Sequence, residues 1–435
     1  MQLIHDADPD GLEARLEAQL SACLDKGGER PIAVGLSGGS DSHALLRLAC
    51  MWAAKHGRRI LALTVDHRLN PKSADWTRQA AAMARDAGAD WQGLAWENAS
   101  GGTAIQERAR MARHALLAEA ARQAGASILM LGHTADDVAE NELMRAQGTS
   151  VGRLRPMSPS PVWPQGRGVT LFRPLLNERR QVLRDWLTAQ GQDWIDDPAN
   201  QDSRYARVRA RQQIAGKIAP PTLQKSVVFA DPGERADAGV FHFDRGELAA
   251  SAHGVSVALL CASGHDVPPR SDRLGTLMAA LGDGEDRTMI LSGTRIEMTG
   301  GRVLMFREAG EQKRARLGAT VLENGHSMVW DNRFEVTARE DGWEILAGAG
   351  NLSKLSDDDR KSLSAMPPAA RLSWPVLHKP LTDHYVLAND RVELRGLCGR
   401  RYRATALCLA DETPQEGALF DLWHGETGST ALFSR

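Results

Sequence analysis

Apolar residues in the first 150 positions follow two alternating patterns, and this alternation constrains the fold more than any other feature. Short β-branched and apolar runs alternate with segments in which apolar residues recur every three or four positions, which predicts alternating strands and helices. The predicted strands are 31–36, 59–65, 91–96 and 128–131, and the predicted helices are 12–24, 41–55, 73–87, 104–124 and one that begins near Ala135. Repeated strand–helix units predict an α/β fold, a parallel sheet with helices on both faces.

The rest of the chain departs from this alternation. Proline and glycine are dense over 158–168, which predicts a mobile loop, and a helix is predicted over 178–190. Short strands over 285–306 and 326–344, joined by Gly and Asn/Asp turns, predict a smaller α+β C-terminal region. With a linker at Pro220-Pro221, we predict three domains: a catalytic domain over 1–217, a substrate-binding region over 218–315 and a C-terminal domain over 316–435.

Cysteine usage and apolar content restrict the cellular setting. The five cysteines form no C-x-x-C pair, and no apolar run approaches the length that crosses a bilayer. The first seventeen residues carry acids early, unlike a signal or transit peptide. We therefore predict a cytoplasmic protein without structural disulfides or a membrane partner.

The charge is balanced overall but not locally. The formal net charge is −2, yet residues 151–217 hold twelve basic side chains against six acidic ones. A basic segment in a neutral protein predicts a surface that contacts polyanions. From charge alone, a solvated arginine-rich helix face is an equally good interpretation.

The segment Ser37-Gly38-Gly39-Ser40-Asp41-Ser42 follows the first predicted strand and enters a helix. Two glycines allow a tight turn that presents N–H groups to an anion, and the helix N-terminus adds a favourable dipole. The serine hydroxyls can donate to phosphate oxygens, whereas Asp41 repels phosphate and is predicted to hold Mg²⁺. The segment is not G-x-x-x-x-G-K-[ST], which excludes a kinase-type P-loop. The alternative is a structural turn capped by serines.

Further polar residues follow the ends of other predicted strands, where ligands of open parallel sheets bind. Asp66 and His67 end the second strand, and His133 follows the fourth. The acids Asp136, Asp137 and Glu140 come next, and they could bind an ammonium or a metal, or take up a proton. Helix capping is the alternative for Asp136 and Asp137.

Arg110 and Arg113 lie three residues apart on one predicted helix. Both could therefore reach a phosphate or a developing negative charge. A solvated helix face is the alternative interpretation for the pair.

The order of these motifs resembles a known family. The Ser-Gly-Gly-x-Asp-Ser segment resembles the PP-loop ATP pyrophosphatases, and the motifs that follow it resemble the tRNA(Ile)-lysidine synthases. The matching residues are Thr64-Val65-Asp66-His67, Gln106 with Arg110 and Arg113, Gly132-His133-Thr134-Ala135-Asp136-Asp137, Ala139-Glu140, Arg173-Pro174-Leu175-Leu176, and Asp197-Pro198 with Asn200.

The resemblance implies a reaction, its cofactors and its partners. Family members use ATP to adenylate the 2-carbonyl oxygen of the wobble cytidine in tRNA(Ile) with a CAU anticodon, and free L-lysine then displaces AMP to leave lysidine. ATP and Mg²⁺ are the implied cofactors, and the sequence is compatible with a homodimer without determining the oligomeric state.

The resemblance also implies roles for individual residues. Residues 37–42 would hold ATP, with Asp41 on the metal. The implied catalytic residues are Asp41, Arg110, His133, Asp137 and Glu140, and the implied substrate-binding residues are Asp66, His67, Arg113, Asp136 and Arg207.

The chain departs from the family pattern at several positions. A glycine usually follows the Asp-His pair, but this chain has Arg68 there, and it has His114 where a tyrosine is usual. Val138, Asn141 and Val208 are further departures. They leave the ATP-binding motifs intact.

Three other functions are alternatives to the lysidine synthase function that the resemblance implies. A tRNA sulfur transferase needs reactive cysteines, and none lies near the motifs. A small-molecule ligase needs neither the arginine-rich segment nor the C-terminal region, and the intact acids argue against a non-catalytic binding protein.

Overall fold

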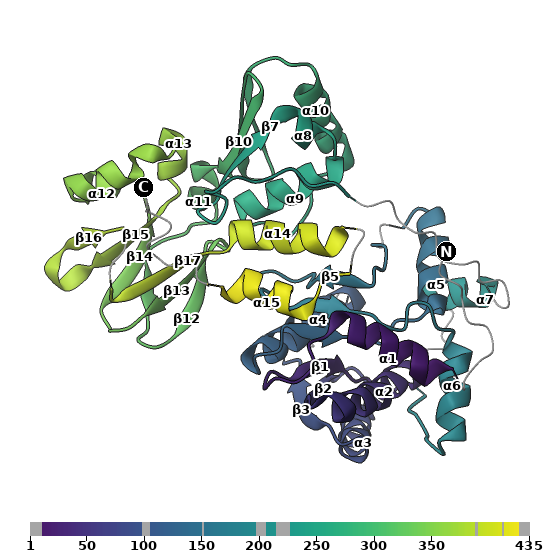
Figure 1. The fold of residues 1–435 in the computed structure, drawn as a ribbon. Helices are drawn as coiled ribbons and strands as arrows, with labels where there is room; N and C mark the ends of the chain where they lie inside the picture. The colour runs from purple at the N-terminus through teal and green to yellow at the C-terminus, as the bar shows by residue number, and fades with distance from the viewer. Residues whose placement is uncertain are drawn as a thin grey trace. The chain divides into compact units, whose positions relative to one another are not determined.

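The chain divides into two compact units in the computed structural model, which describes residues 11–97, 105–149, 152–196, 206–214, 227–387, 390–410 and 413–425. The first unit comprises 1–225 together with 412–421, and the second comprises 226–411 with 422–435 (Figure 1). The three-domain division made from the sequence stays a prediction.

A six-stranded sheet forms the centre of the first unit. Its strand order is β3-β2-β1-β4-β6-β5, and all neighbouring strands are parallel except the edge strand β5, which pairs antiparallel with β6. The chain winds outward from β1 to β3 on one side and then returns to place β4 on the other side of β1. In open α/β sheets, ligands bind in a crevice at such a reversal, which here lies at the carboxyl ends of β1 and β4. The strands are β1 (Ile32–Gly35), β2 (Ile60–Asp66), β3 (Asp90–Ala95), β4 (Ile128–Met130), β5 (Met157–Pro159) and β6 (Thr170–Phe172).

Helices cover both faces of this sheet. Ala33 of β1 belongs to one core with Leu117 and Ala121 of α4, whereas its neighbours Ile32 and Val34 are buried on the opposite face, because successive strand residues alternate. The α/β fold class is thereby confirmed. The helices are α1 (Leu12–Cys23), α2 (Ser40–His56), α3 (Ser73–Asp86), α4 (Ile105–Gln123), α5 (Ala135–Ala146), α6 (Arg180–Ala189) and α7 (Ala206–Ile214).

A segment from the C-terminal end of the chain belongs to the first unit. Both carboxylate oxygens of Glu416 accept from Arg58, at 2.8 and 2.9 Å, and each of the two side chains is only 1% exposed. The backbone N–H of Asp25 donates to Glu416 as well. Breaking such a buried pair costs about 3–5 kcal/mol, so this contact anchors residues 412–421 firmly.

The second unit has two hydrophobic cores. The first lies between the antiparallel sheet β7-β10-β9-β8 and the helices that follow β7. The uniformly apolar helix α9 is buried there, and the sequence pattern did not predict it. The elements of this part are β7 (Val240–Asp244), α8 (Arg245–Ala249), α9 (Ala252–Ser263), α10 (Ser271–Gly282), β8 (Arg287–Leu291), β9 (Thr294–Thr299), β10 (Arg302–Arg307) and α11 (Ala309–Arg314).

The second core of this unit joins two small sheets, β11-β14-β15-β16 and β12-β13-β17. The short strands predicted over 285–306 and 326–344 are present, which agrees with an α+β region. The elements are β11 (Thr320–Leu322), β12 (Ser327–Trp330), β13 (Phe334–Ala338), β14 (Trp343–Ala347), α12 (Asp357–Ser362), α13 (Pro368–Arg371), β15 (Pro375–Lys379), β16 (His384–Val386) and β17 (Val392–Gly396), with short 3₁₀ turns at Leu352–Lys354, Leu363–Ala365 and Pro380–Thr382. Helix α14 (Cys398–Leu409) contributes Cys398 and Tyr402 to the first core of this unit, and α15 (Glu416–His424) begins in the C-terminal segment that belongs to the first unit.

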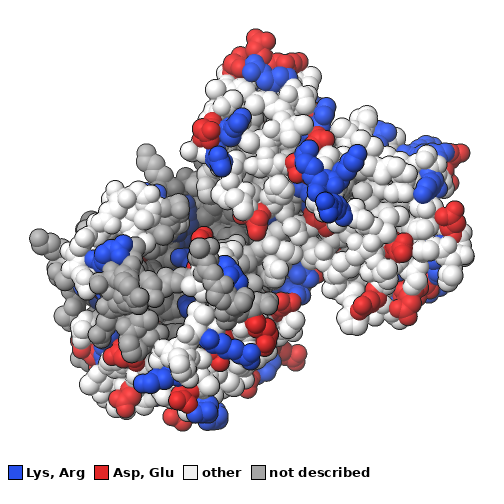
Figure 2. Space-filling model, turned by 180° about the vertical axis from the view of Figure 1, so that it is seen from behind, with Lys and Arg blue, Asp and Glu red and all other residues white. Residues whose placement is uncertain are grey.

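Two general properties concern the helices and the surface of the described residues. Across the described ranges, no helix combines the length and apolarity that a membrane span requires. Figure 2 shows Lys and Arg side chains interspersed with Asp and Glu over the visible part of the described surface, as the near-zero net charge leads one to expect.

Candidate functional site

The predicted phosphate loop is a tight turn closed by its own serines. The Ser42 hydroxyl accepts from the Ser37 N–H at 3.2 Å and donates to the Gly39 carbonyl at 3.1 Å. The two hydroxyls of Ser37 and Ser42 are also hydrogen-bonded, at 3.0 Å. The loop therefore holds its shape through contacts within residues 37–42, and α2 begins directly behind it.

Gly38 is required by both its backbone and its surroundings. Its φ of +82° lies in the left-handed region, and an added Cβ would lie only 2.3 Å from Cδ1 of Ile195. The Ile195 N–H donates to the Gly38 carbonyl at 2.9 Å, and the His43 ring is hydrogen-bonded to the Asp193 carbonyl. Residues 193–195 thus pack against the loop.

Gly132 brings the acidic motif against the phosphate loop. A Cβ on Gly132 would lie 2.9 Å from the backbone C and O atoms of Asp41. The end of β4 can approach the start of α2 this closely only because residue 132 has no side chain. Two motifs far apart in the sequence therefore meet at the crevice between β1 and β4.

Asp137 has a structural role as well as a place in this crevice. Its Oδ2 accepts from the backbone N–H of Thr134 at 2.8 Å and from the Thr134 hydroxyl at 3.0 Å, which caps α5. Its other oxygen, Oδ1, contacts Nη2 of Arg180 at 3.2 Å. The capping interpretation is correct for one oxygen and leaves the second facing the site.

Arg180, the first residue of α6, connects the predicted acids. Its Nε donates to Asp41 at 2.8 Å, and its terminal nitrogens contact Asp137 at 3.2 Å and Glu140 at 3.4 Å. We refer to Asp41, Asp137 and Glu140 as the acidic cluster. The sequence pattern did not predict a site role for Arg180. Arg180 lies shortly after the matched Arg173–Leu176 motif, but in the sequence it was only one of twelve basic residues in its segment.

Two further arginines compensate the remaining acids. Arg211 of α7 donates to Glu140 at 2.7 Å. Asp136 accepts from the backbone N–H of Arg180 at 2.8 Å and lies 3.4 Å from Nε of Arg179. The four acids at this edge are therefore held by helix α6, its flanking residue and helix α7.

Burial and ion pairing together set the pKa values of Asp41 and Arg180. Burial raises the pKa of Asp41, and the nearby guanidinium of Arg180 offsets only part of that rise. Burial lowers the pKa of Arg180, but the charges of Asp41 and Asp137 outweigh it, so this pKa lies above its ordinary value. Arg180 is therefore a permanent cation in the site.

Three predicted residues, His67, Arg110 and Arg113, form a basic cluster together with His114, which the sequence identified only as a departure from the family pattern. Nε of Arg113 donates to Nε2 of His67 at 3.0 Å, so that nitrogen carries no proton. Burial, followed by the charge of Arg113, lowers the pKa of His67 to about 4. Burial, followed by Arg110 and Arg173, lowers the pKa of His114 to about 4 as well. Both imidazoles are neutral at pH 7, beside exposed arginines.

Arg68 is a departure from the family pattern that the structure explains. Its φ is +53°, a conformation that favours glycine, the residue usual at this position. The Arg68 N–H donates to Oδ1 of Asp66 at 2.8 Å, and its guanidinium contacts Glu97 at 3.0 Å. These two contacts support the conformation, but they also engage one oxygen of Asp66.

The remaining predicted residues lie at the end of β4 or outside the described residues. His133 lies half-buried just beyond β4, with its N–H donating to the Leu131 carbonyl. The side chains of Arg207 and Gln106, and residues Asp197, Pro198 and Asn200, lie outside the described part of the chain.

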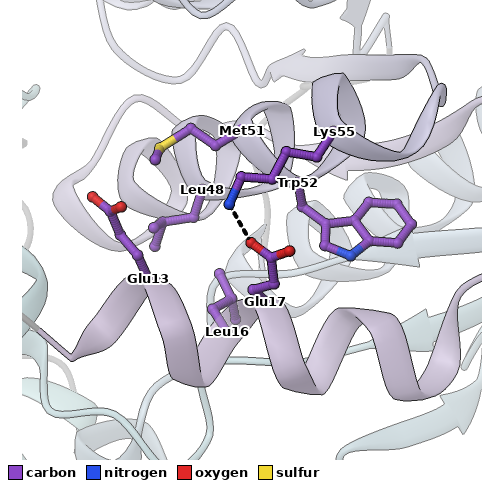
Figure 3. Close-up of a pocket in the computed structure, with 7 residues that line it drawn as sticks. All are labelled: Glu13, Leu16, Glu17, Leu48, Met51, Trp52 and Lys55. Carbon is purple, nitrogen blue, oxygen red and sulfur yellow. Dashed lines mark hydrogen bonds and ion pairs between the residues drawn. The ribbon is translucent and has the colours of Figure 1, made fainter.

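A small hollow elsewhere in the first unit involves none of these motifs. It lies between α1 and α2, where Lys55 and Glu17 form an ion pair beside Trp52 (Figure 3). Its lining includes neither the phosphate loop nor any member of the acidic cluster.

Comparison with known proteins agrees with this geometry. The model of the PP-loop domain matches residues 12–218. A tRNA(Ile)-lysidine synthase of Caulobacter vibrioides is 43% identical and aligns over 92% of this chain and 98% of its own. This chain belongs to the tRNA(Ile)-lysidine synthase family. Another member, from Hyphomonas neptunium, is 36% identical over 71% of this chain and 90% of its own.

Family membership implies that the chain uses ATP. Among solved structures, the U34-tRNA thiolase NcsA of Methanococcus maripaludis is similar with a TM-score of 0.38 and 15% identity, covering 47% of this chain and 71% of that one. That similarity is too low to compare sites.

The donor set at the crevice is compatible with Mg²⁺ supplied with a nucleotide. Over the described ranges, no three His, Cys, Asp or Glu side chains are arranged as a metal cage. Mg²⁺, however, commonly takes one or two carboxylates and completes its shell with phosphate oxygens and water. The carboxylate of Asp41, within the phosphate loop, fits that arrangement.

Proposed function

We propose that this chain ligates free L-lysine to the 2-position of the wobble cytidine of tRNA(Ile) with a CAU anticodon. The reaction passes through an adenylated tRNA and releases pyrophosphate and AMP. Membership in the tRNA(Ile)-lysidine synthase family supports this function. The observation that carries it is the contact of Gly132 with Asp41, which sets a phosphate loop beside buried acids at one crevice.

In the first step, the cytidine oxygen attacks the α-phosphorus of ATP and pyrophosphate leaves. We assign residues 37–42 to the phosphates, through loop N–H groups and serine hydroxyls at the N-terminus of α2. Mg²⁺ would neutralise charge on the departing pyrophosphate, and Asp41 would hold it. Arg110 would stabilise the developing negative charge, and Arg113 would bind the substrate tRNA.

In the second step, the side-chain amine of lysine attacks C2 of the cytidine, and the C2–O bond to AMP breaks. An ammonium has a reference pKa of about 10.4, so it must lose a proton first. We assign Asp137 and Glu140 to binding the ammonium, one of them taking up the proton. Asp136 is placed beside them by its contact with the Arg180 N–H.

The remaining predicted residues are assigned to the RNA. Asp66 and His67 would contact the nucleotide at the end of β2, whereas His133, at the end of β4, would be a catalytic residue. Arg207, in the basic segment, would contact the tRNA backbone. A cytoplasmic location fits these partners, and the homodimer stays a prediction.

A labelling experiment tests this function. The protein is incubated with ATP, radiolabelled lysine and tRNA(Ile) with a CAU anticodon, and in parallel with the same tRNA lacking the wobble cytidine. We expect label in the first RNA only. Label in neither RNA would overturn the proposal, and equal label in both would show that the cytidine is not the acceptor.

A further inference from the structure

Arg173 directly follows β6 and is only 7% exposed, yet neither step described above uses it. The second step also has no residue assigned to the departing AMP. We propose that Arg173 binds the phosphate of the adenylated intermediate and stabilises the negative charge that develops as AMP leaves. This inference rests on the proposed function, because it adds a residue to the second step of the same reaction.

Strand register sets the position of Arg173. Leu171 of β6 belongs to the core that α4 covers, and Arg173, two residues further, lies on the same face of the sheet. The Leu131 N–H donates to the Phe172 carbonyl at 2.9 Å, so the pairing of β4 with β6 continues to the rim. Gly132 and Arg173 are the next residues of these two strands, and neighbouring strands lie about 4.8 Å apart. Arg173 is therefore a neighbour of the segment that contacts the phosphate loop.

The hydrogen bonds of the Arg173 guanidinium go to neutral oxygen atoms. Its Nη1 donates to the Arg155 carbonyl and to the Ser158 hydroxyl, both at 3.0 Å. Nε is buried, and no atom of the described residues accepts a hydrogen bond from it. A buried donor without an acceptor is costly, so this nitrogen points to a ligand that can accept from it.

A second cation lies near this guanidinium. Burial, followed by the charge of Arg110, lowers the pKa of Arg173 to about 10. Both arginines also contribute to the low pKa of His114, whose Nδ1 is buried and has no hydrogen-bond partner within the described ranges. Like charges repel, and an anion bound beside them relieves that repulsion. Arg180 is in the opposite situation, because three carboxylates contact it and would repel a phosphate.

The second step of the proposed reaction produces such an anion. The adenylated tRNA carries its phosphate as a diester with a single negative charge. When the lysine amine attacks C2, the C2–O bond breaks, its electron pair stays on the oxygen, and AMP leaves as a phosphate monoester with a second pKa of about 6. The phosphate therefore gains charge in this step, whereas in the first step it has a single charge before and after. A buried guanidinium suits this enclosed phosphate better than an RNA backbone on the outer surface.

A binding experiment tests the phosphate contact without catalysis. Affinities for AMP and for adenosine, which differ only in the phosphate, are measured by equilibrium dialysis with wild type, Arg173→Gln and Ser158→Ala. We expect Arg173→Gln to bind AMP about tenfold more weakly and adenosine as wild type does. Ser158→Ala, the matched control, removes a hydrogen-bond partner of Arg173 but keeps the cation, so both affinities should stay at the wild-type values. Unchanged AMP affinity in Arg173→Gln, or equal weakening for AMP and adenosine, would overturn the inference.

A single-turnover experiment then separates the two steps. The tRNA is adenylated with α-labelled ATP in the absence of lysine, and release of labelled AMP is followed once lysine is added. Arg173→Gln should slow AMP release by about 10²-fold and the adenylation step by much less. If thermal unfolding shows that Arg173→Gln does not fold, Arg173→Lys replaces it, and we expect a smaller loss that is again larger in the second step. Equal losses in the two steps would mean that Arg173 only holds the segment around Ser158.

The remaining outcomes separate this inference from the function on which it rests. If wild type transfers no label from ATP or lysine to tRNA, the proposed function is overturned, and the inference with it. If wild type transfers label and Arg173→Gln keeps both its AMP affinity and its second-step rate, only the inference fails. Weaker tRNA binding at unchanged AMP affinity would assign Arg173 to an RNA phosphate and would likewise overturn it.

Discussion

The acidic cluster and the basic cluster lie at the same carboxyl-end rim of the sheet, but they treat charge in opposite ways. The acids are largely buried, and Arg180 and Arg211 compensate them within the protein. In the basic cluster, Arg110 and Arg113 are exposed, and their neighbouring imidazoles are neutral. The rim therefore keeps its negative charge inside and presents its positive charge outward.

This difference fits two kinds of ligand. A buried set of carboxylates suits a small cation, whereas exposed arginines suit a polyanion too large to be enclosed. Under the proposed function, the acidic cluster serves the amine and the pyrophosphate side, and the basic cluster serves the RNA. Variants that affect one cluster should therefore leave the function of the other intact.

The largest effect is expected at Asp41. Asp41→Ala should lower ATP-dependent pyrophosphate release by about 10³-fold, because the charge on the leaving group loses its stabilisation. Binding of tRNA, measured by filter retention, should change little. Asp75→Ala, which removes an exposed acid from the first turn of α3, is the control. Lost tRNA binding with normal pyrophosphate release would contradict the division between the clusters.

A smaller effect is expected at Glu140, on the amine side. Glu140→Gln should raise the lysine concentration needed for half-maximal labelling by about 10²-fold, since a buried charge partner of the ammonium is lost. Pyrophosphate release in the first step should stay within a few-fold of wild type. Glu142→Gln, on the same helix, provides the control. A first step reduced as strongly as the second would place Glu140 with the metal instead.

The sequence predicts the two clusters to different extents. The parallel sheet, the phosphate loop and the capping at α5 follow from spacing and residue type within short segments, so they can be predicted locally. The role of Arg180 cannot, because its strongest partner, Asp41, is 139 residues away in the sequence. One arginine among eleven in a basic segment carries no signal for which of them turns inward.

The same reason explains two features outside the site. Glu416 pairs with Arg58 across 358 residues, so the return of residues 412–421 to the first unit depends on a tertiary contact that no local pattern encodes. Helix α9 is buried over most of its length after its exposed first residues Ala252 and His253, so apolar residues occupy most of its positions and show neither helical nor strand periodicity.

On the basic side, Arg113→Ala should weaken tRNA binding by about tenfold at low salt. If Arg113 contacts a phosphate, the slope of log affinity against log salt should become shallower by about one unit. Arg122→Ala, near the far end of the same helix, should leave both quantities unchanged. An unaltered slope together with weaker binding would instead assign Arg113 to a base or to ATP. Lysine dependence should stay normal, which distinguishes this variant from Glu140→Gln.

The smallest effect concerns the pH dependence of stability, which the neutral His114 should produce. Its pKa is lowered from about 6.5 in the unfolded chain to about 4 in the folded one. Between these values the unfolded chain binds a proton that the folded chain does not, so stability falls as pH drops from 6.5 toward 4 and is unaffected above 6.5. Denaturant unfolding measures the free energy of unfolding at pH 7.5 and 5.5. The decrease in this free energy between the two pH values should be about 1 kcal/mol smaller in His114→Gln than in wild type. His326→Gln, which changes an exposed histidine, is the control and should show the same decrease in the free energy of unfolding as wild type. An equal decrease in all three proteins would mean that His114 is already protonated beside the arginines. The contrast between the two clusters would then be lost.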